Sequence, residues 1–181
     1  MTNIQTDDEL VDIVDENDII IKSLNKRDAV SDPKLIHRAV SFIVFNNKKQ
    51  VLLQLRSKTM SSDPWVWRYT ASGHVRSGEN PSDAAERELF EELGLKAKPI
   101  FFKKVLKTFV TEKNVAVPRF FWVYYSVVDG EPAITIDKSE VADARWVNVS
   151  DLVEFSKVNK YYLNDFSHEV IMEISNKLKL I

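Results

Sequence analysis

The sequence predicts an α+β fold, in which the strands of a β-sheet are covered by a small number of helices. Two apolar runs, at residues 39–45 and 51–56, have the density of buried strands and are joined by a turn pair at Asn46-Asn47. A helix with clear start and stop signals lies in the middle of the chain, and an amphipathic helix lies near its end. With 181 residues, the chain suits one domain with a sizeable core.

The elements before these strands follow from turn residues between short apolar runs. Residues 10–15 and 19–22 are predicted to form a hairpin around the turn Glu16-Asn17-Asp18. Residues 25–36 are polar and are predicted as a loop with some helix, which breaks at Pro33. This N-terminal part, residues 1–36, is expected to extend the core of the same domain.

The elements after the central helix follow from the same alternation of apolar runs and turns. Val170, Ile171 and Ile174 lie on one side of the last helix, so that side is expected to pack on the core. The predicted elements are, in order, paired strands at 100–110 and 119–128, a turn at 129–132, a strand at 144–149, a helix over 149–155 with Ser150 as its cap, and a helix over 166–178.

The composition excludes several classes of function. The net charge of −2 gives no overall attraction to nucleic acid or to an anionic membrane, so neither is expected as a partner. The absence of cysteine excludes disulfides, thiolate metal sites and a catalytic thiol. The sequence contains no signal peptide and no apolar run of about 18 residues, so a cytoplasmic location is expected.

The segment from Gly73 to Leu95 carries most of the functional information. At 100° per residue, Glu88, Glu91 and Glu92 lie within about a quarter-turn of one another on a helix. Three adjacent carboxylates repel one another unless a positive charge lies among them, and hard divalent cations prefer such oxygen ligands. The alternative is an ordinary amphipathic helix with solvated acids.

The boundaries of this helix are predicted from capping signals. Asn80 is a suitable N-cap, Pro81 fits the first helical position, and Gly94 suits a left-handed C-cap. The preceding residues, 73–79, are predicted as a glycine-containing loop whose backbone approaches a phosphate.

The spacing in this segment resembles the Nudix box, G-x5-E-x7-R-E-U-x-E-E-x-G-U with U aliphatic, at every specified position. The resemblance implies a Nudix fold, with a mixed sheet between helices, for the whole chain, with a core at 37–150, the box at 73–95 and C-terminal helices at 151–181. It also implies a hydrolase that uses Mg²⁺ or Mn²⁺ to cleave a diphosphate linked to another moiety.

The resemblance implies a role for the charged positions of the box and for the residue before it. Glu88, Glu91 and Glu92 would be metal ligands, and Glu88 would also orient or deprotonate the attacking water. Glu79 would be a further ligand, and the carbonyl of Ser72 would complete the metal shell. Arg87 would hold the glutamates by charge-assisted hydrogen bonds, and the backbone at Gly73 would approach the substrate.

Sequence beyond the box resembles the isopentenyl-diphosphate-isomerase-like branch of this superfamily, in the segments ELVDIVDENDIIIKS, IHRAVSFIVFNNKKQVLLQLRS, WVWRYTASGHV and SEVADARWVNVSDL. The isomerase cysteine is replaced by Ser72, whose hydroxyl is a much poorer acid–base group than a thiol of pKa about 8.5. His37 and His74 match two isomerase metal ligands, but a third is absent, and the isomerase Glu-x-Glu pair is half present, as Glu112 with Asn114.

Several residues outside the box are also candidates. Glu140 resembles a loop glutamate that serves as base or extra ligand, with a solvated loop acid as the alternative. Arg56 and Arg68 are candidate phosphate-binding side chains, and His74 is a candidate for phosphate or metal contact. His37 is interpreted as structural. Four aromatic residues are either cleft or core residues: Trp65, Trp67, Tyr69 and Phe121.

These observations favour a Nudix hydrolase that cleaves a diphosphate bond in a nucleotide-like small molecule, as a monomer or homodimer. An isopentenyl-diphosphate isomerase with altered acid–base groups is the first alternative. A Nudix sensor that binds nucleotides without turnover is the second. The intact carboxylates argue against the sensor, and the missing cysteine argues against the isomerase.

Overall fold

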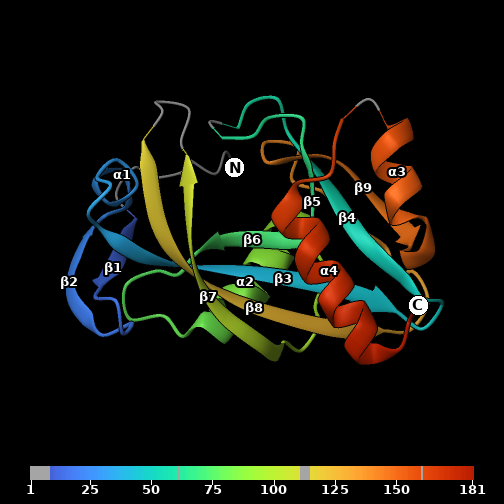
Figure 1. Ribbon diagram of the computed structural model, residues 1–181, viewed down its shortest axis with the longest axis horizontal. Helices are drawn as coiled ribbons and strands as arrows, with labels where there is room; N and C mark the ends of the chain where they lie inside the picture. Colours follow the sequence, from blue (N-terminus) through green and yellow to red (C-terminus); the bar gives the residue numbers. More distant parts are fainter. Residues whose placement is uncertain (1–8, 61, 111–114, 160) are drawn as a thin grey trace.

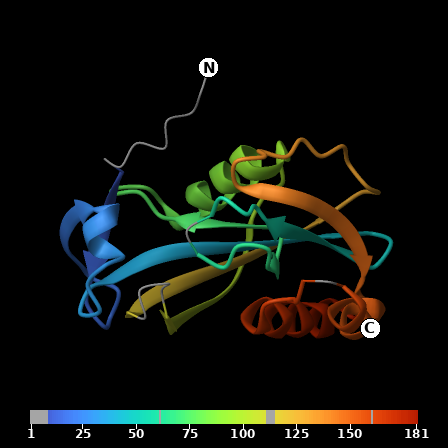
Figure 2. The same cartoon turned by 90° about the horizontal axis from the view of Figure 1, so that it is seen from above.

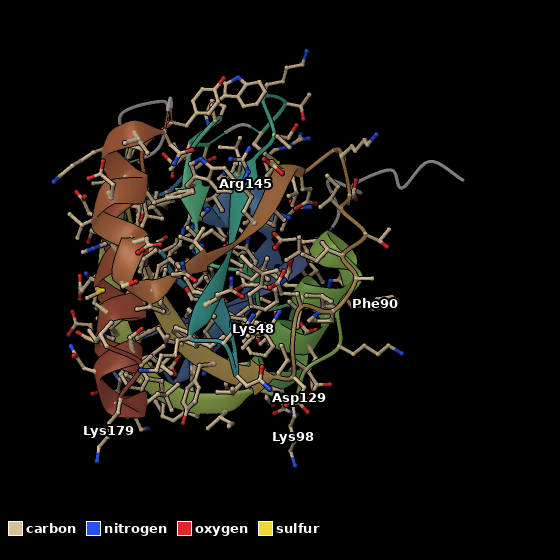
Figure 3. The ribbon with its side chains drawn as sticks, turned by 90° about the vertical axis from the view of Figure 1, so that its right-hand side faces the viewer. Lys48, Phe90, Lys98, Asp129, Arg145 and Lys179 are labelled. Atoms are coloured by element: carbon tan, nitrogen blue, oxygen red, sulfur yellow. The ribbon has the colours of Figure 1, made fainter. Side chains whose placement is uncertain are left out.

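The computed structural model describes residues 9–60, 62–110, 115–159 and 161–181. A mixed β-sheet lies between two helical layers, with α2 on one face and α3 and α4 on the other (Figures 1 and 2). Figure 3 shows the same layers edge-on, with α2 and Phe90 on the side opposite α4. This arrangement confirms the predicted α+β class.

The structure defines strands, one short 3₁₀ helix (η1) and α-helices with the following bounds: β1 (Leu10–Val14), β2 (Ile20–Asn25), α1 (Lys26–Ala29), β3 (Ile36–Asn46), β4 (Gln50–Arg56), β5 (Trp67–Arg68), β6 (Ala71–His74), α2 (Pro81–Leu93), β7 (Ile100–Val110), β8 (Ala116–Val128), β9 (Val141–Asn148), η1 (Val149–Asp151), α3 (Leu152–Val158) and α4 (Asp165–Leu178).

The sheet splits next to its central hairpin, and this split positions the site. β3 and β4 pair only beside their turn, at Phe45 and Val51. Beyond that point the two strands diverge. β6 pairs antiparallel with β3, and β5 pairs antiparallel with β4, so the segment 67–74 fills the space between the diverging strands. β1 continues this edge of β3, β8 runs parallel along its other edge, and β9 pairs with β4.

The two faces of β3 contribute to two separate parts of the core. Ile43 and Phe45 pack with α4, whereas Phe42 and Val44 pack with α2. Because successive side chains of a strand point to opposite faces, a strand covered on both sides must be apolar at nearly every position. This explains the continuous apolar run that predicts β3.

Most predicted elements are confirmed, with shifted ends. The N-terminal hairpin forms as β1 and β2, and a short helix, α1, lies within the polar segment that follows. The strands β7 and β8 pair as predicted, and the last helix is α4, in which Val170, Ile171 and Ile174 are buried.

Two local predictions are wrong. Ser150 does not cap the helix over 149–155. The 3₁₀ turn η1 precedes α3, and Asn148 is the N-cap residue of η1. Ser150 lies within η1, and its hydroxyl donates to the carboxylate of Asp151. Gly73 lies in strand β6 rather than in a loop, because its backbone pairs opposite Val40. The Glu112–Asn114 pair lies outside the described residues.

Candidate active site

The helix α2 begins and ends where its capping signals predict. Asn80 has the extended conformation of an N-cap, although its side chain makes no capping hydrogen bond, and Pro81 is the first helical residue. Gly94 has φ 65° in the left-handed region, and its N–H donates to the carbonyl of Phe90 at 2.9 Å. These ends fix which residues of α2 face the sheet.

The apolar face of α2 carries two glutamates into the protein. Ala85, Leu89 and Leu93 are fully buried against the part of the core beneath β3. Glu88 and Glu92 lie one turn apart beside this face and are 8% and 2% exposed. The side chain of Glu91, in contrast, is 47% exposed. The predicted acidic stripe is therefore divided into two buried carboxylates and one at the surface.

The guanidinium of Arg87 connects three of the predicted acids. Its Nε and Nη2 donate to the two oxygens of Glu79 at 2.8 and 2.9 Å. Its Nη1 donates to Glu88 at 2.6 Å and to Glu91 at 3.1 Å, and Nη2 also donates to the carbonyl of His74 at 3.0 Å. Charge-assisted bonds of this kind are strong and directional, so Arg87 sets the positions of these carboxylates.

Glu92 is held from the other side of the split sheet. Its Oε2 accepts a hydrogen bond from Gln54 Nε2 at 2.9 Å and from the backbone N–H of Ser72 at 3.2 Å. The sequence alone did not predict Gln54 as a site residue. The available signal was an amide inside the apolar run VLLQL, because an amide that is buried with such a run needs partners.

Gly73 is required by the position of Glu88. A Cβ atom on Gly73 would lie 1.9 Å from Glu88 Oε1 and 2.0 Å from its carboxyl carbon. The carboxylate of Glu88 therefore occupies the volume that any other residue at position 73 would fill. The box glycine permits this contact between α2 and β6.

The buried carboxylates have strongly perturbed acidities. Burial raises the pKa of Glu88 to about 7. Burial also raises the pKa of Glu92, and the negative charge of Glu88 raises it further. Glu140, from the loop before β9, further raises the pKa of both groups, so it lies within electrostatic range of them. For Glu79, burial alone would raise the pKa, but the hydrogen bonds from Arg87 and the Arg76 N–H outweigh burial and lower it.

These donors fit a hard divalent cation by their chemistry. Burial makes Glu88 and Glu92 hard to ionise, and Arg87 compensates the charge of Glu88 only in part, so a bound cation would stabilise both carboxylates. Within the part of the chain that the structure describes, no three acidic or histidine side chains already converge on one point. The guanidinium of Arg87 instead lies among Glu79, Glu88 and Glu91.

The two candidate phosphate-binding arginines lie within electrostatic range of Glu92. Arg56 is buried and donates to the carbonyl and hydroxyl of Ser62 at 2.9 and 3.2 Å. Burial, and then the charge of Arg68, lower the pKa of Arg56 to about 10. Arg68 lies over the ring of Tyr69, and its Nη2 donates to the Tyr69 hydroxyl at 3.2 Å.

The histidines lie on the opposite face of β6 from Glu88. His74 pairs with Ala39, which faces α4, whereas the adjacent Gly73 faces α2. The His74 ring stacks on His37, with ring centroids 5.1 Å apart. Burial and then the charge of Arg119 lower the pKa of His37 to about 3, so this ring is neutral at neutral pH.

The four candidate aromatic residues divide between core and surface. Trp67, Tyr69 and Phe121 are almost completely buried among the residues that pack with α4, which supports the core alternative for them. Trp65 is 36% exposed and stacks on Tyr161 at 5.0 Å.

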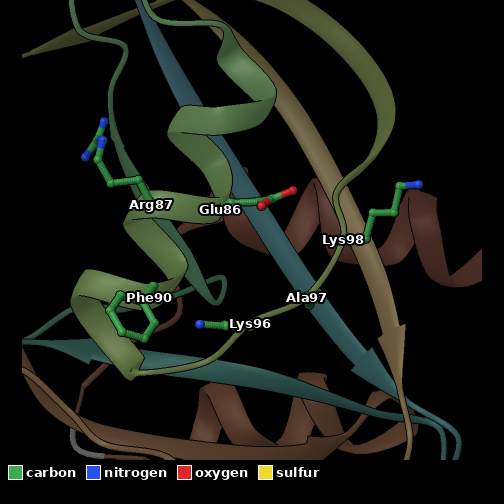
Figure 4. Close-up of a pocket in the computed structure, with 6 residues that line it drawn as sticks. All are labelled: Glu86, Arg87, Phe90, Lys96, Ala97 and Lys98. Carbon is green, nitrogen blue, oxygen red and sulfur yellow. The ribbon is translucent and has the colours of Figure 1, made fainter.

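A surface hollow lies on the outer side of α2 (Figure 4). Its volume is about 620 Å³, and the exposed ring of Phe90 and the side chain of Lys96 line it. Glu88 and Glu92 do not line this hollow. Arg87 does, but its guanidinium extends away from Lys98 toward the carboxylates. The lining residues are Glu86, Arg87, Phe90, Lys96, Ala97 and Lys98.

Known proteins share this sequence pattern and this fold. A family model described as the NUDIX domain matches residues 35–167. Isopentenyl-diphosphate Delta-isomerase 2 of Photorhabdus laumondii is 34% identical over 145 residues, which are 80% of each chain. An uncharacterised Nudix hydrolase of Nostoc is 30% identical over 147 residues, 81% of this chain and 85% of that protein. A crystal structure of a Deinococcus radiodurans protein matches with a TM-score of 0.69 at 20% identity, covering 91% of this chain and 98% of that one.

The protein belongs to the Nudix family, and its fold is the Nudix fold. Its relatives include proteins named isopentenyl-diphosphate isomerases as well as Nudix hydrolases, which confirms the predicted branch. No helix among the described residues is long and apolar enough to cross a membrane.

Proposed function

We propose that this protein is a metal-dependent hydrolase that cleaves a diphosphate bond in a nucleotide-like small molecule. One observation carries the proposal: two buried carboxylates, Glu88 and Glu92, have raised pKa values at the point where β6 and α2 meet. Buried acids in this state are costly to the fold and typical of functional sites. The intact arginine–glutamate network around them is the arrangement that such chemistry needs.

Five groups would hold the metal ion in this proposal: the carboxylates of Glu79, Glu88, Glu91 and Glu92, and the carbonyl of Ser72. A bound Mg²⁺ or Mn²⁺ supplies positive charge to the phosphate oxygens and lowers the pKa of a bound water. Arg87 keeps three of these carboxylates in position before the substrate arrives.

Glu88 is the proposed base. Its Oε1 accepts the hydrogen bond from Arg87, which leaves Oε2 to accept a proton from the attacking water. A pKa of about 7 suits a group that must take up and release a proton near neutral pH. The water oxygen bonds to phosphorus as the bond to the bridging oxygen breaks, and the leaving phosphate carries the displaced charge. Arg56 offsets this charge, Arg68 is a further phosphate-binding side chain, and Glu140 is a further base or ligand.

Isomerisation of isopentenyl diphosphate is the second candidate, because the Photorhabdus relative carries that name. Against it, position 72 holds a serine and the chain has no cysteine. The serine hydroxyl ionises far above neutral pH, so it exchanges protons with carbon poorly compared with a thiol.

Phosphorus NMR of the purified protein tests both candidates together. The protein is incubated with Mg²⁺ and a panel of nucleoside di- and triphosphates, NADH, ADP-ribose and isopentenyl diphosphate. New monophosphate or orthophosphate signals are expected, and they would identify the substrate class. Conversion of isopentenyl to dimethylallyl diphosphate with the diphosphate intact would contradict the proposal, as would binding of a nucleotide without any new product.

A further inference from the structure

Three further polar side chains lie on the face of β6 away from the glutamates: Arg119, His37 and His74. Arg68, on β5, lies within electrostatic range of Arg119, and we call these four residues the basic cluster. Arg119 pairs with His37 across the parallel strands β8 and β3, and His37 stacks on His74 from β6. Figure 1 shows β6 and β8 on either side of β3, so these three strands bring Arg119, His37 and His74 together.

Several buried polar atoms of the basic cluster lack hydrogen-bond partners, although Nη2 of Arg68 donates to the Tyr69 hydroxyl. Among the described residues, the buried side-chain atoms with no partner include Nε of Arg68, Nε of Arg119, both ring nitrogens of His37 and Nε2 of His74. The hydroxyl of Ser41, on the same face of β3, is also without a partner. Buried polar atoms are nearly always paired in folded proteins, and leaving one unpaired costs about 1–3 kcal/mol. So many in one place indicate a ligand.

The charge of the basic cluster identifies the sign of that ligand. Burial, and then the charge of Arg68, lower the pKa of Arg119, so the two guanidinium groups lie close enough to repel each other. A metal cation would add to this repulsion. An apolar chain would leave the donors unpaired. An anion satisfies both requirements, since every arginine N–H is a donor and a histidine ring offers at least one.

We propose that the basic cluster is an anion site that binds a phosphate group of the substrate other than those bound at Glu88 and Glu92. The planar guanidinium fork matches a phosphate, and arginine is favoured where buried phosphates are bound. Glu88 lies beneath Gly73 on the α2 face of β6, whereas His74 lies on the α4 face, so one strand separates the two sites.

The assignment of this phosphate to the substrate rests on the proposed hydrolase function. It narrows that function to substrates that carry an anionic group in addition to the scissile diphosphate. An isopentenyl group does not meet this requirement, because its five-carbon chain would lie against unpaired cationic groups.

The test uses inorganic phosphate as the probe and requires no turnover. ¹⁵N-labelled full-length protein in EDTA is titrated with phosphate at constant ionic strength, and the arginine Nε–H signals are followed. Saturable shifts are expected for Arg68 and Arg119 and not for Arg145, an exposed arginine on β9 (Figure 3). Each Nε–H signal is assigned from the single variant in which that arginine is replaced, because its signal is then missing from the spectrum.

Two variants provide the matched comparison. Arg119→Gln is expected to abolish the phosphate-dependent shift of Arg68, while Arg145→Gln leaves it unchanged. Arg119→Lys keeps the charge and the fold but not the fork, and it is expected to weaken phosphate binding at least about tenfold. Absence of saturable shifts in the wild type, or equal affinity in Arg119→Gln, would overturn the proposal. Selective broadening of His37 and His74 signals by Mn²⁺ would overturn it in favour of a cation site.

The outcome is independent of the hydrolase test. Phosphate binding without hydrolysis of any compound in the panel would refute the proposed function and keep the anion site. Hydrolysis of a compound without phosphate binding at the basic cluster would refute the anion site and keep the proposed function. If the protein both hydrolyses a compound and binds phosphate at the basic cluster, Arg119→Gln is expected to raise KM for that compound at least about tenfold with kcat nearly unchanged.

Discussion

Replacement of Glu88 by glutamine is expected to stabilise the protein while it abolishes turnover. In the folded state, burial raises the pKa of this carboxyl from 4.5 to about 7. At about 1.4 kcal/mol for each pKa unit, this difference in pKa between the unfolded and folded states lowers the free energy of unfolding by about 3 kcal/mol when Glu88 is ionised. Glutamine has nearly the same shape, keeps an oxygen to accept the bond from Arg87, and carries no charge.

The sign of this effect depends on pH. Between about pH 7 and pH 4.5 the folded protein holds a proton on Glu88 that the unfolded chain has released, so wild-type stability rises as pH falls through this window. Above about pH 8 the folded protein bears the full cost of the buried charge. Glu88→Gln is therefore expected to be more stable than wild type by about 3 kcal/mol at pH 8 and by less than about 1 kcal/mol at pH 5.

Urea unfolding followed by tryptophan fluorescence, with EDTA present at both pH values, measures this difference. Glu86→Gln is the matched control, because Glu86 is an exposed glutamate on the same helix, and its stability is expected to follow wild type. The reasoning would be refuted if Glu88→Gln were no more stable than wild type at pH 8, or if its advantage were the same at pH 5.

Three further substitutions test the site by turnover of the compound that phosphorus NMR identifies. Glu92→Gln removes a proposed metal ligand and is expected to reduce turnover at least about 10²-fold with unchanged circular dichroism; wild-type rates would remove this assignment. Gly73→Ala places a Cβ atom 1.9 Å from Glu88 Oε1, so turnover is expected to fall at least about tenfold, and a fully active variant would contradict the observed packing. Arg87→Lys replaces a guanidinium that contacts three glutamates and His74, and a loss of about 10²-fold is expected. Retained activity in this variant would mean that the network does not position the carboxylates.

The helix α2 was predictable because its signals are local. Pro81 and Gly94 act through their own backbone preferences, and the apolar face of the helix follows from spacing alone. The strands of the N-terminal hairpin and of β7 and β8 were predictable for a similar reason, since each pair is adjacent in the chain. Ser150 shows the limit of such signals: a suitable capping residue has no effect where the chain first forms a 3₁₀ turn.

The remaining features depend on contacts between distant parts of the chain. The parallel pairing of β8 with β3 joins strands about 80 residues apart, and no local pattern indicates it. The same pairing places Arg119 beside His37, so the basic cluster was invisible in the sequence. Gln54 meets Glu92 only because β4 diverges from β3 and leaves room for β5 and β6.

The site places opposite charges on the two faces of one short strand. Glu88 and Glu92 lie on the α2 side of β6, where burial raises both pKa values, and Arg119, His37 and His74 of the basic cluster lie on the other side. Each group is costly without a ligand, because neither its charges nor its donors are fully satisfied within the protein. A substrate that brings metal-bound phosphates to one face and a further phosphate to the other would relieve both costs at once. The stability lost in the free protein would then be recovered on binding, which favours highly charged substrates over isopentenyl diphosphate.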